Sequence, residues 1–169
     1  MPPERRPDIS ILAAYGAAVL AFAYALVSLY WAVGNDGLIS TVGGYVQSFE
    51  RNGGAGPVVV AVVATLAKVA GGLLALALVR PWGRAIPRNW LLGIAVAASA
   101  ALVLYGLAEV GAAIVVLNGA IHPSGVVDRN VLRWHTELWD LWFLLWGLLL
   151  AVATNGYRRR TAPRVPSVP

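Results

Sequence analysis

Four ionisable side chains lie within apolar runs of this sequence and are the residues best suited to do chemistry. Lys68 lies in the second run, Glu109 in the third, and Glu137 and Asp140 in the fourth. A charge in lipid hydrocarbon is costly, so such residues usually face the interior, pair with one another and mark functional sites. Buried carboxyl groups can serve as general acids or bases, or can bind a cation.

The depths of these four residues are similar. At a rise of ~1.5 Å per residue, Glu109 and Asp140 lie about 13 Å below the outer ends of their predicted helices, Lys68 about 16 Å and Glu137 about 9 Å. Similar depth allows these side chains to meet if the charged faces of the three helices converge.

The last apolar run separates its polar and aromatic residues onto different faces, at ~100° per residue. One face carries Arg133, Glu137 and Asp140 at spacings i, i+4 and i+7. Nearly opposite lie three tryptophans, Trp139, Trp142 and Trp146. If the acids face the bundle interior, we expect the tryptophans to face lipid, a second copy of the chain or a membrane partner.

These positions predict an outward-facing polar chamber. Its floor would consist of Lys68, Glu109 and Asp140, which are the candidate catalytic residues. The other candidate ligand-binding residues are Glu137 and Arg133 near the mouth, and Tyr24, Ser28, Trp31 and Tyr105 along the walls. Because these groups include three acids and two cations, one acid would be protonated or would await a cation.

The elements that must position these residues are membrane helices. The chain is 59% hydrophobic and 12% charged, whereas soluble domains have about 25% charged residues. A helix of ~20 apolar residues crosses ~30 Å of hydrocarbon. We predict an all-α fold, an antiparallel bundle of four transmembrane helices within residues 9–154. The predicted spans are about 9–33, 57–79, 90–117 and 131–154, with a disordered N-terminus (1–8) and a basic, proline-rich tail (155–169).

The basic residues predict the orientation of the bundle. Nine arginines precede the first run, fill the second connection or follow the last run, and three lie in the other two connections. By the positive-inside rule, both termini are then cytoplasmic. The net charge of +5 therefore favours contact with anionic lipid headgroups and not with nucleic acid. We expect a multi-pass protein of a cell membrane, the inner membrane of a bacterium.

Several kinds of chemistry have no support in the sequence. It contains no cysteine, which excludes thiol catalysis, disulfides and zinc–thiolate sites within the chain. It has no phosphate-binding glycine loop and none of the common hydrolase or dinucleotide motifs. His135 and Glu137 diverge on a helix, so we predict no metal site, and we predict no cofactor.

Two stretches carry a resemblance to a known family. Residues 29–34 (Leu-Tyr-Trp-Ala-Val-Gly) and 41–45 (Thr-Val-Gly-Gly-Tyr) resemble the end of the first helix in a family of small bacterial four-helix membrane proteins. Residues 137–147 (Glu-Leu-Trp-Asp-Leu-Trp-Phe-Leu-Leu-Trp-Gly) resemble its last helix. The family is a domain of unknown function, so the resemblance implies the four-helix topology and no activity.

Three classes of function fit these observations. The first is a binding or catalytic chamber for a small amphiphilic or lipid-derived ligand, and this class includes both enzymes and non-enzymes. The second is an accessory or structural subunit of a membrane complex, in which the buried ion pairs are structural. The third is a proton- or cation-coupled transporter that uses the same acids.

Overall fold

The computed structural model describes residues 8–33, 35, 55–119 and 135–162, and in the last segment the side chains from residue 138 onward. All regular structure in these segments is helical. The long helices are α1 (Ile9–Ala32), α4 (Ala55–Ala77), α5 (Arg88–Leu117) and α7 (Leu141–Arg160). A short 3₁₀ helix, η1 (Pro81–Ala85), and a π-helix, η2 (His135–Asp140), complete the described elements.

Four helices are long and apolar enough to cross a membrane, the last of them from Leu138 to Arg160. The predicted all-α fold with four transmembrane helices is therefore confirmed. The last helix continues past the predicted end at Thr154 to Arg160. Long arginine side chains allow this extension, because they can lie along the bundle while their charged ends reach water.

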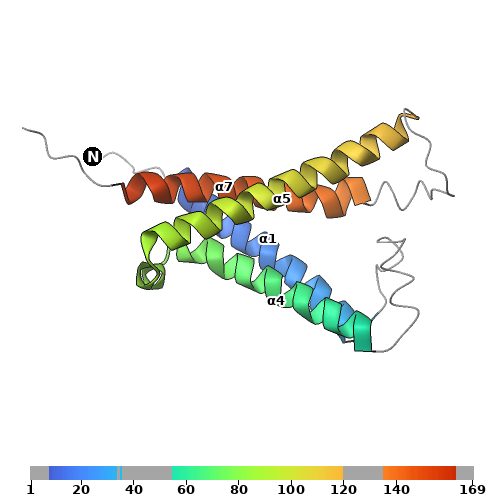
Figure 1. The fold of residues 1–169 in the computed structure, drawn as a ribbon, viewed down its shortest axis with the longest axis horizontal. Helices are drawn as coiled ribbons and strands as arrows, with labels where there is room; N and C mark the ends of the chain where they lie inside the picture. Colours follow the sequence, from blue (N-terminus) through green and yellow to red (C-terminus); the bar gives the residue numbers. More distant parts are fainter. Residues whose placement is uncertain (1–7, 34, 36–54, 120–134, 163–169) are drawn as a thin grey trace, which may run out of the picture.

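The four helices form two pairs. Helix α1 packs along α4, α5 packs along α7, and α1 also packs on α7. Figure 1 shows α4 and α5 close together where η1 joins them and diverging from there. Although only a short link with η1 separates these two helices along the chain, they have few contacts. The main neighbour of α5 is α7.

Small residues explain which faces pack. Helix α1 buries a set of alanines, Ala13, Ala14, Ala17, Ala18 and Ala21. Helices α5 and α7 approach closely at two glycines, Gly106 against the backbone of Leu144 and Gly147 against the backbone of Val103. Small residues at such positions permit close backbone approach, where packing, and not the hydrophobic effect, drives association in lipid.

A polar network fixes the end of the molecule at which α1 begins and α7 ends. Asp8 caps α1, and its carboxylate accepts hydrogen bonds from the backbone N–H and the hydroxyl of Ser10, at 2.9 and 2.8 Å. The other carboxylate oxygen of Asp8 lies 3.0 Å from the Arg160 guanidinium. This network ties the first turn of α1 to the last turn of α7.

The Asp8 network makes stability depend on pH. The hydrogen bonds from Ser10, followed by Arg160, lower the pKa of the Asp8 carboxyl below its ordinary value of 3.8. The ionised Asp8 carboxylate therefore contributes fully to the stability of the folded protein above pH 3.8. This contribution is lost as the pH falls through the lower pKa that Asp8 has in the folded state. We expect Asp8→Asn, which can still cap the helix, to lose part of this acid dependence. Thermal unfolding in detergent at pH 6 and pH 3 measures it, and an unchanged acid dependence in the variant would contradict this assignment.

Candidate ligand-binding site

Lys68 lies near the middle of α4 and contacts two residues of α1. Its Nζ donates a hydrogen bond to the Ser28 hydroxyl at 2.9 Å and lies 4.3 Å from the centroid of the Tyr24 ring. Tyr24 and Ser28 are both buried, one helical turn apart on α1. A hydroxyl and an aromatic face both stabilise an ammonium group, so this cluster accommodates the cation within the span.

An aromatic layer connects this cluster to α7 and α5. Measured between ring centroids, Tyr24 lies 5.5 Å from Trp139, 5.5 Å from Trp142 and 5.0 Å from Phe143. The same layer reaches two other predicted wall residues. Trp31 lies 5.5 Å from Trp139, and Tyr105 lies 5.1 Å from Phe143. The predicted wall residues Tyr24, Ser28, Trp31 and Tyr105 therefore share one neighbourhood.

The two described acids of the predicted chamber lie in different surroundings. Asp140 is only 3% exposed and interacts electrostatically with the hydroxyl groups of Tyr24 and Tyr105. Glu109 also interacts with Tyr105, but it lies on an exposed face of α5. Asp140 thus belongs to the buried cluster, whereas Glu109 lies at its edge. The predicted mouth residue Arg133 and the side chain of the other mouth residue, Glu137, lie outside the described part of the structure.

The orientation predicted for the tryptophans of the last helix is wrong. Trp139 and Trp146 are 3% and 4% exposed. Trp142 donates a hydrogen bond from its Nε1 to the Leu20 carbonyl of α1 at 3.1 Å. These side chains therefore pack inside the bundle and do not form an outer stripe. A second copy or a membrane partner stays a prediction, but without this surface.

The neighbours of the last helix explain this error. The prediction assumed that only the face with the acids points into the bundle, but α7 packs on both α1 and α5. More than one of its faces is therefore buried. The span also begins with a π-helix, His135–Asp140, which has more residues per turn than an α-helix. Trp139 and Asp140, at the end of this π-helix, are both buried.

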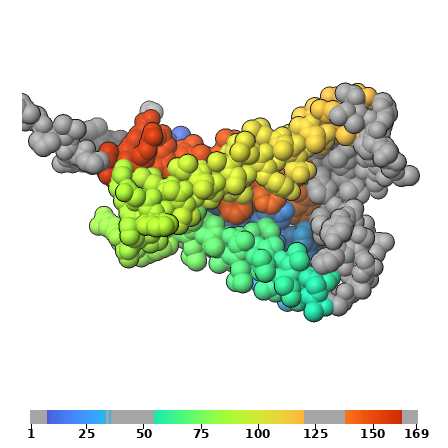
Figure 2. Space-filling view, viewed as in Figure 1, coloured from blue at the N-terminus to red at the C-terminus, as the bar shows by residue number. Residues whose placement is uncertain are grey.

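A cavity of about 340 Å³ opens between the two helix pairs. Figure 2 shows the hollow between α4 and α5, with parts of α7 and α1 visible at its base. The lining residues are Ala64, Ala67, Lys68 and Gly71 of α4, Ala98, Ala101 and Leu102 of α5, and Phe143, Trp146 and Leu150 of α7. Lys68 is the one charged residue of this lining.

This cavity differs from the predicted chamber in polarity and position. It is apolar apart from Lys68, and it lies midway along the helices and not at their outer ends. The buried Nε1 of Trp146, which lines it, has no hydrogen-bond partner in the described part of the chain. In chemical terms, the site offers an apolar slot with an ammonium group at one edge.

The small and bulky lining residues were missed as site residues. Ala64, Ala67 and Gly71 recur at i, i+3 and i+7 on α4, and Phe143, Trp146 and Leu150 have the same spacing on α7. A stripe of small residues that faces a stripe of bulky ones indicates a possible cavity between two helices. The same two stripes also fit ordinary helix packing, so the sequence alone does not distinguish the two.

The Lys68 cluster, the aromatic layer and the cavity all lie within residues that match a known family. Residues 21–150 match the family described as "Protein of unknown function (DUF3995)". The chain belongs to this family. The match spans the two stretches that carried the resemblance, so the predicted membership in a family of unknown function is confirmed. No curated protein and no solved structure matches the chain.

The described segments contain no cluster of metal-ligating side chains. No three His, Cys, Asp or Glu side chains in them lie close enough together to hold a metal ion. The family description names no ligand or cofactor.

Proposed function

We propose that this membrane protein binds an anionic amphiphile or lipid-derived molecule in the cavity between α4, α5 and α7. The observation that carries the proposal is the cavity itself, an apolar slot of about 340 Å³ with one ammonium group. Ligand sites commonly have volumes of ~300–1,000 Å³, apolar walls and a few placed polar groups.

The chemistry of the lining supports an amphiphile over a wholly polar solute. Alanine, leucine, phenylalanine and tryptophan side chains suit a hydrocarbon body. Lys68 donates one hydrogen bond to Ser28, whereas an ammonium group has three N–H donors. The donors that have no partner in the described segments are available to a carboxylate or phosphate at the head of the ligand.

Asp140 is the second group that we assign to this function. It is the one buried carboxyl group in the described segments, and it interacts with Tyr24, whose ring also contacts Lys68. If the bound molecule undergoes a proton transfer, Asp140 is the residue positioned to serve as the acid or base. This role extends the binding proposal and does not underlie it.

We also propose that both ends of the chain lie on the cytoplasmic side of a bacterial inner membrane. One end of the bundle is rich in arginine. Arg80 and Arg84 lie at η1, Arg88 begins α5, and Arg158 to Arg160 end α7. Such an excess of arginine supports a cytoplasmic location for that end. The resemblance to bacterial proteins supports the choice of membrane.

The proposal is tested by removing the Lys68 charge. We expect purified Lys68→Met to bind oleate at least about tenfold more weakly than the wild type, because a hydrogen bond to a charged group contributes ~1.5–3 kcal/mol. Oleyl alcohol, which has the same chain without the charge, should bind both proteins alike. Native mass spectrometry of ligand titrations in a mild detergent measures both.

Thr65→Val is the matched control on the same helix. Among the described residues, the Thr65 hydroxyl donates its one hydrogen bond to the Ala61 carbonyl of its own helix, at 2.8 Å, so this variant should bind oleate like the wild type. Equal oleate affinity in Lys68→Met would refute the contact with the anionic head. If the wild type binds neither oleate nor oleyl alcohol, the cavity is not an amphiphile site.

The two other predicted functions make different demands. A coupled transporter requires proton- or cation-dependent flux in liposomes. An accessory subunit requires a protein that co-purifies with the wild type and with Lys68→Met alike. No feature of the described residues specifically supports a transporter or an accessory subunit, whereas the cavity supports binding of an amphiphile.

A further inference from the structure

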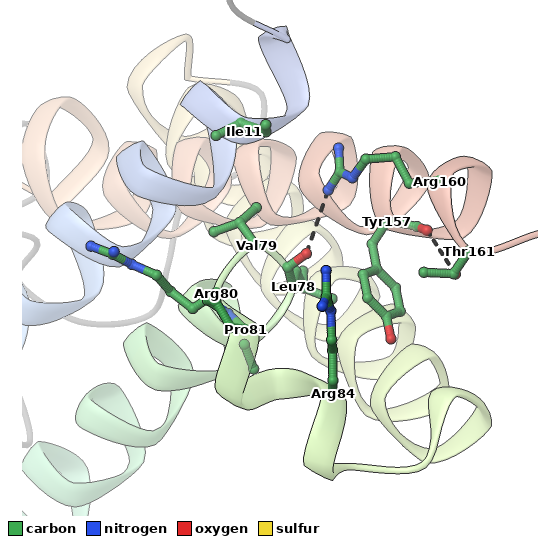
Figure 3. A pocket seen from close by; sticks show the side chains of 10 residues that line it. Ile11, Leu78, Val79, Arg80, Pro81, Arg84, Tyr157, Arg160 and Thr161 are labelled. Carbon is green, nitrogen blue, oxygen red and sulfur yellow. Dashed lines mark hydrogen bonds between the residues drawn. The ribbon is translucent and has the colours of Figure 1, made fainter.

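A second cavity lies at the arginine-rich end of the molecule, far from Lys68 along the helices. It has a volume of about 260 Å³ and lies between the end of α4, η1, the start of α1 and the end of α7. Its charged lining residues are Arg80, Arg84 and Arg160, all basic. Figure 3 shows these residues around the pocket.

The three arginines differ in how they are held. Arg160 bonds to Asp8 at 3.0 Å and reaches the Leu78 carbonyl at 3.4 Å. Arg80 lies 5.5 Å from the centroid of the Tyr15 ring. Within the described part of the chain, Arg84 has neither a hydrogen bond nor an ion pair. Its guanidinium therefore lines the pocket with all its donors free.

The orientation of two of these arginines favours an anion. In Figure 3, the side chains of Arg84 and Arg160 extend toward the Leu78 carbonyl from opposite sides, whereas Arg80 points away. Two cations directed into one pocket repel each other, and an anion between them converts that repulsion into attraction. Guanidinium groups match phosphate oxygens well, because they donate in parallel pairs.

The depth of the pocket indicates the type of anion. Trp82 in η1 and Trp90 in the first turn of α5 are both exposed, Trp90 at 70%. Exposed tryptophans at the end of a membrane helix mark the level of the lipid headgroups. Basic pockets between membrane helices at this level are suited to phosphate-bearing headgroups.

We infer that Arg84 and Arg160 form a binding site for a phosphate group at the membrane surface. The phosphate would come from the phosphodiester of an anionic phospholipid or from free phosphate in solution. Arg160 is already fixed by Asp8 and supplies a preorganised wall, while Arg84 closes on the anion. This site is separate from the cavity at Lys68 and does not depend on the function proposed there.

The test uses the purified full chain in a neutral detergent. Thermal unfolding is followed while phosphatidylglycerol, phosphatidylcholine or inorganic phosphate is added, at constant ionic strength maintained with sodium chloride. We expect phosphatidylglycerol to raise the melting temperature of the wild type and phosphatidylcholine to have little effect. In Arg84→Gln, about fivefold more phosphatidylglycerol should be needed for the same rise, since a basic residue near a membrane surface contributes ~1 kcal/mol.

Arg159→Gln is the control. Arg159 is next to Arg160 in the last turn of α7, but it is exposed and does not line the pocket. It removes the same charge and should titrate like the wild type. A rise with inorganic phosphate alone, lost in Arg84→Gln, would support the site and identify the soluble anion as the source. No rise with either anion, or an equal effect of both substitutions, would overturn the inference.

Discussion

Gly106→Ala should separate α5 from α7 and destabilise the protein by about 1–3 kcal/mol, the usual cost of overpacking. A Cβ at this position would lie 2.7 Å from the Leu144 backbone nitrogen and 2.8 Å from its Cα. Backbone atoms, unlike the end of a flexible side chain, have no room to move aside. Thermal unfolding in detergent measures the loss.

Gly111→Ala on the same helix is the control. A Cβ there has no atom within 4 Å, and alanine favours helix over glycine by ~1 kcal/mol. We expect this variant to be as stable as the wild type or more stable. Equal stability of the two variants would show that α5 and α7 do not cross at Gly106.

Trp146→Ala should be the most destabilising single change in α7. Trp146 is buried among Gly71, Phe143 and Leu150, and removing a buried tryptophan ring typically costs ~3–5 kcal/mol because a cavity remains. The same variant enlarges the proposed ligand cavity. Chemical denaturation in mixed micelles measures the loss of stability.

Trp90→Ala distinguishes a buried tryptophan from a lipid-exposed one. Trp90 is largely exposed at the end of its helix, so its loss should change stability by no more than ~0.5 kcal/mol. If Trp146→Ala were as mild as Trp90→Ala, Trp146 would face lipid as the sequence pattern predicted.

The fold was largely predictable because hydrocarbon thickness constrains the sequence directly. Each span needs ~20 apolar residues, and α1, α4 and α5 start and end close to the predicted limits, whereas the last helix is shifted toward the C-terminus. The pairing of helices was less predictable. Ala97 and Ala100 are small enough to form a packing face on α5, yet both are exposed. In lipid, composition alone does not distinguish a face that packs from one that meets acyl chains.

The site was predictable where α-helical spacing holds. Tyr24, Ser28 and Lys68 lie together on regular helices, and their grouping follows from the spacing on α1 and the level of Lys68 on α4. The prediction failed on the last span, because this helix packs on both α1 and α5 and buries more than one face. The acids and the tryptophans were assigned to an inner and an outer face, whereas Asp140 and Trp139 are both buried.

The pairing of α1 with α4 and of α5 with α7 has a consequence for biogenesis. Each pair consists of helices that follow one another along the chain, and chains are synthesised from the N-terminus. The first hairpin can assemble in the bilayer while the ribosome is still producing the second. The cavity at Lys68, whose walls come from both hairpins, then forms only when the second hairpin docks, as the last step of assembly.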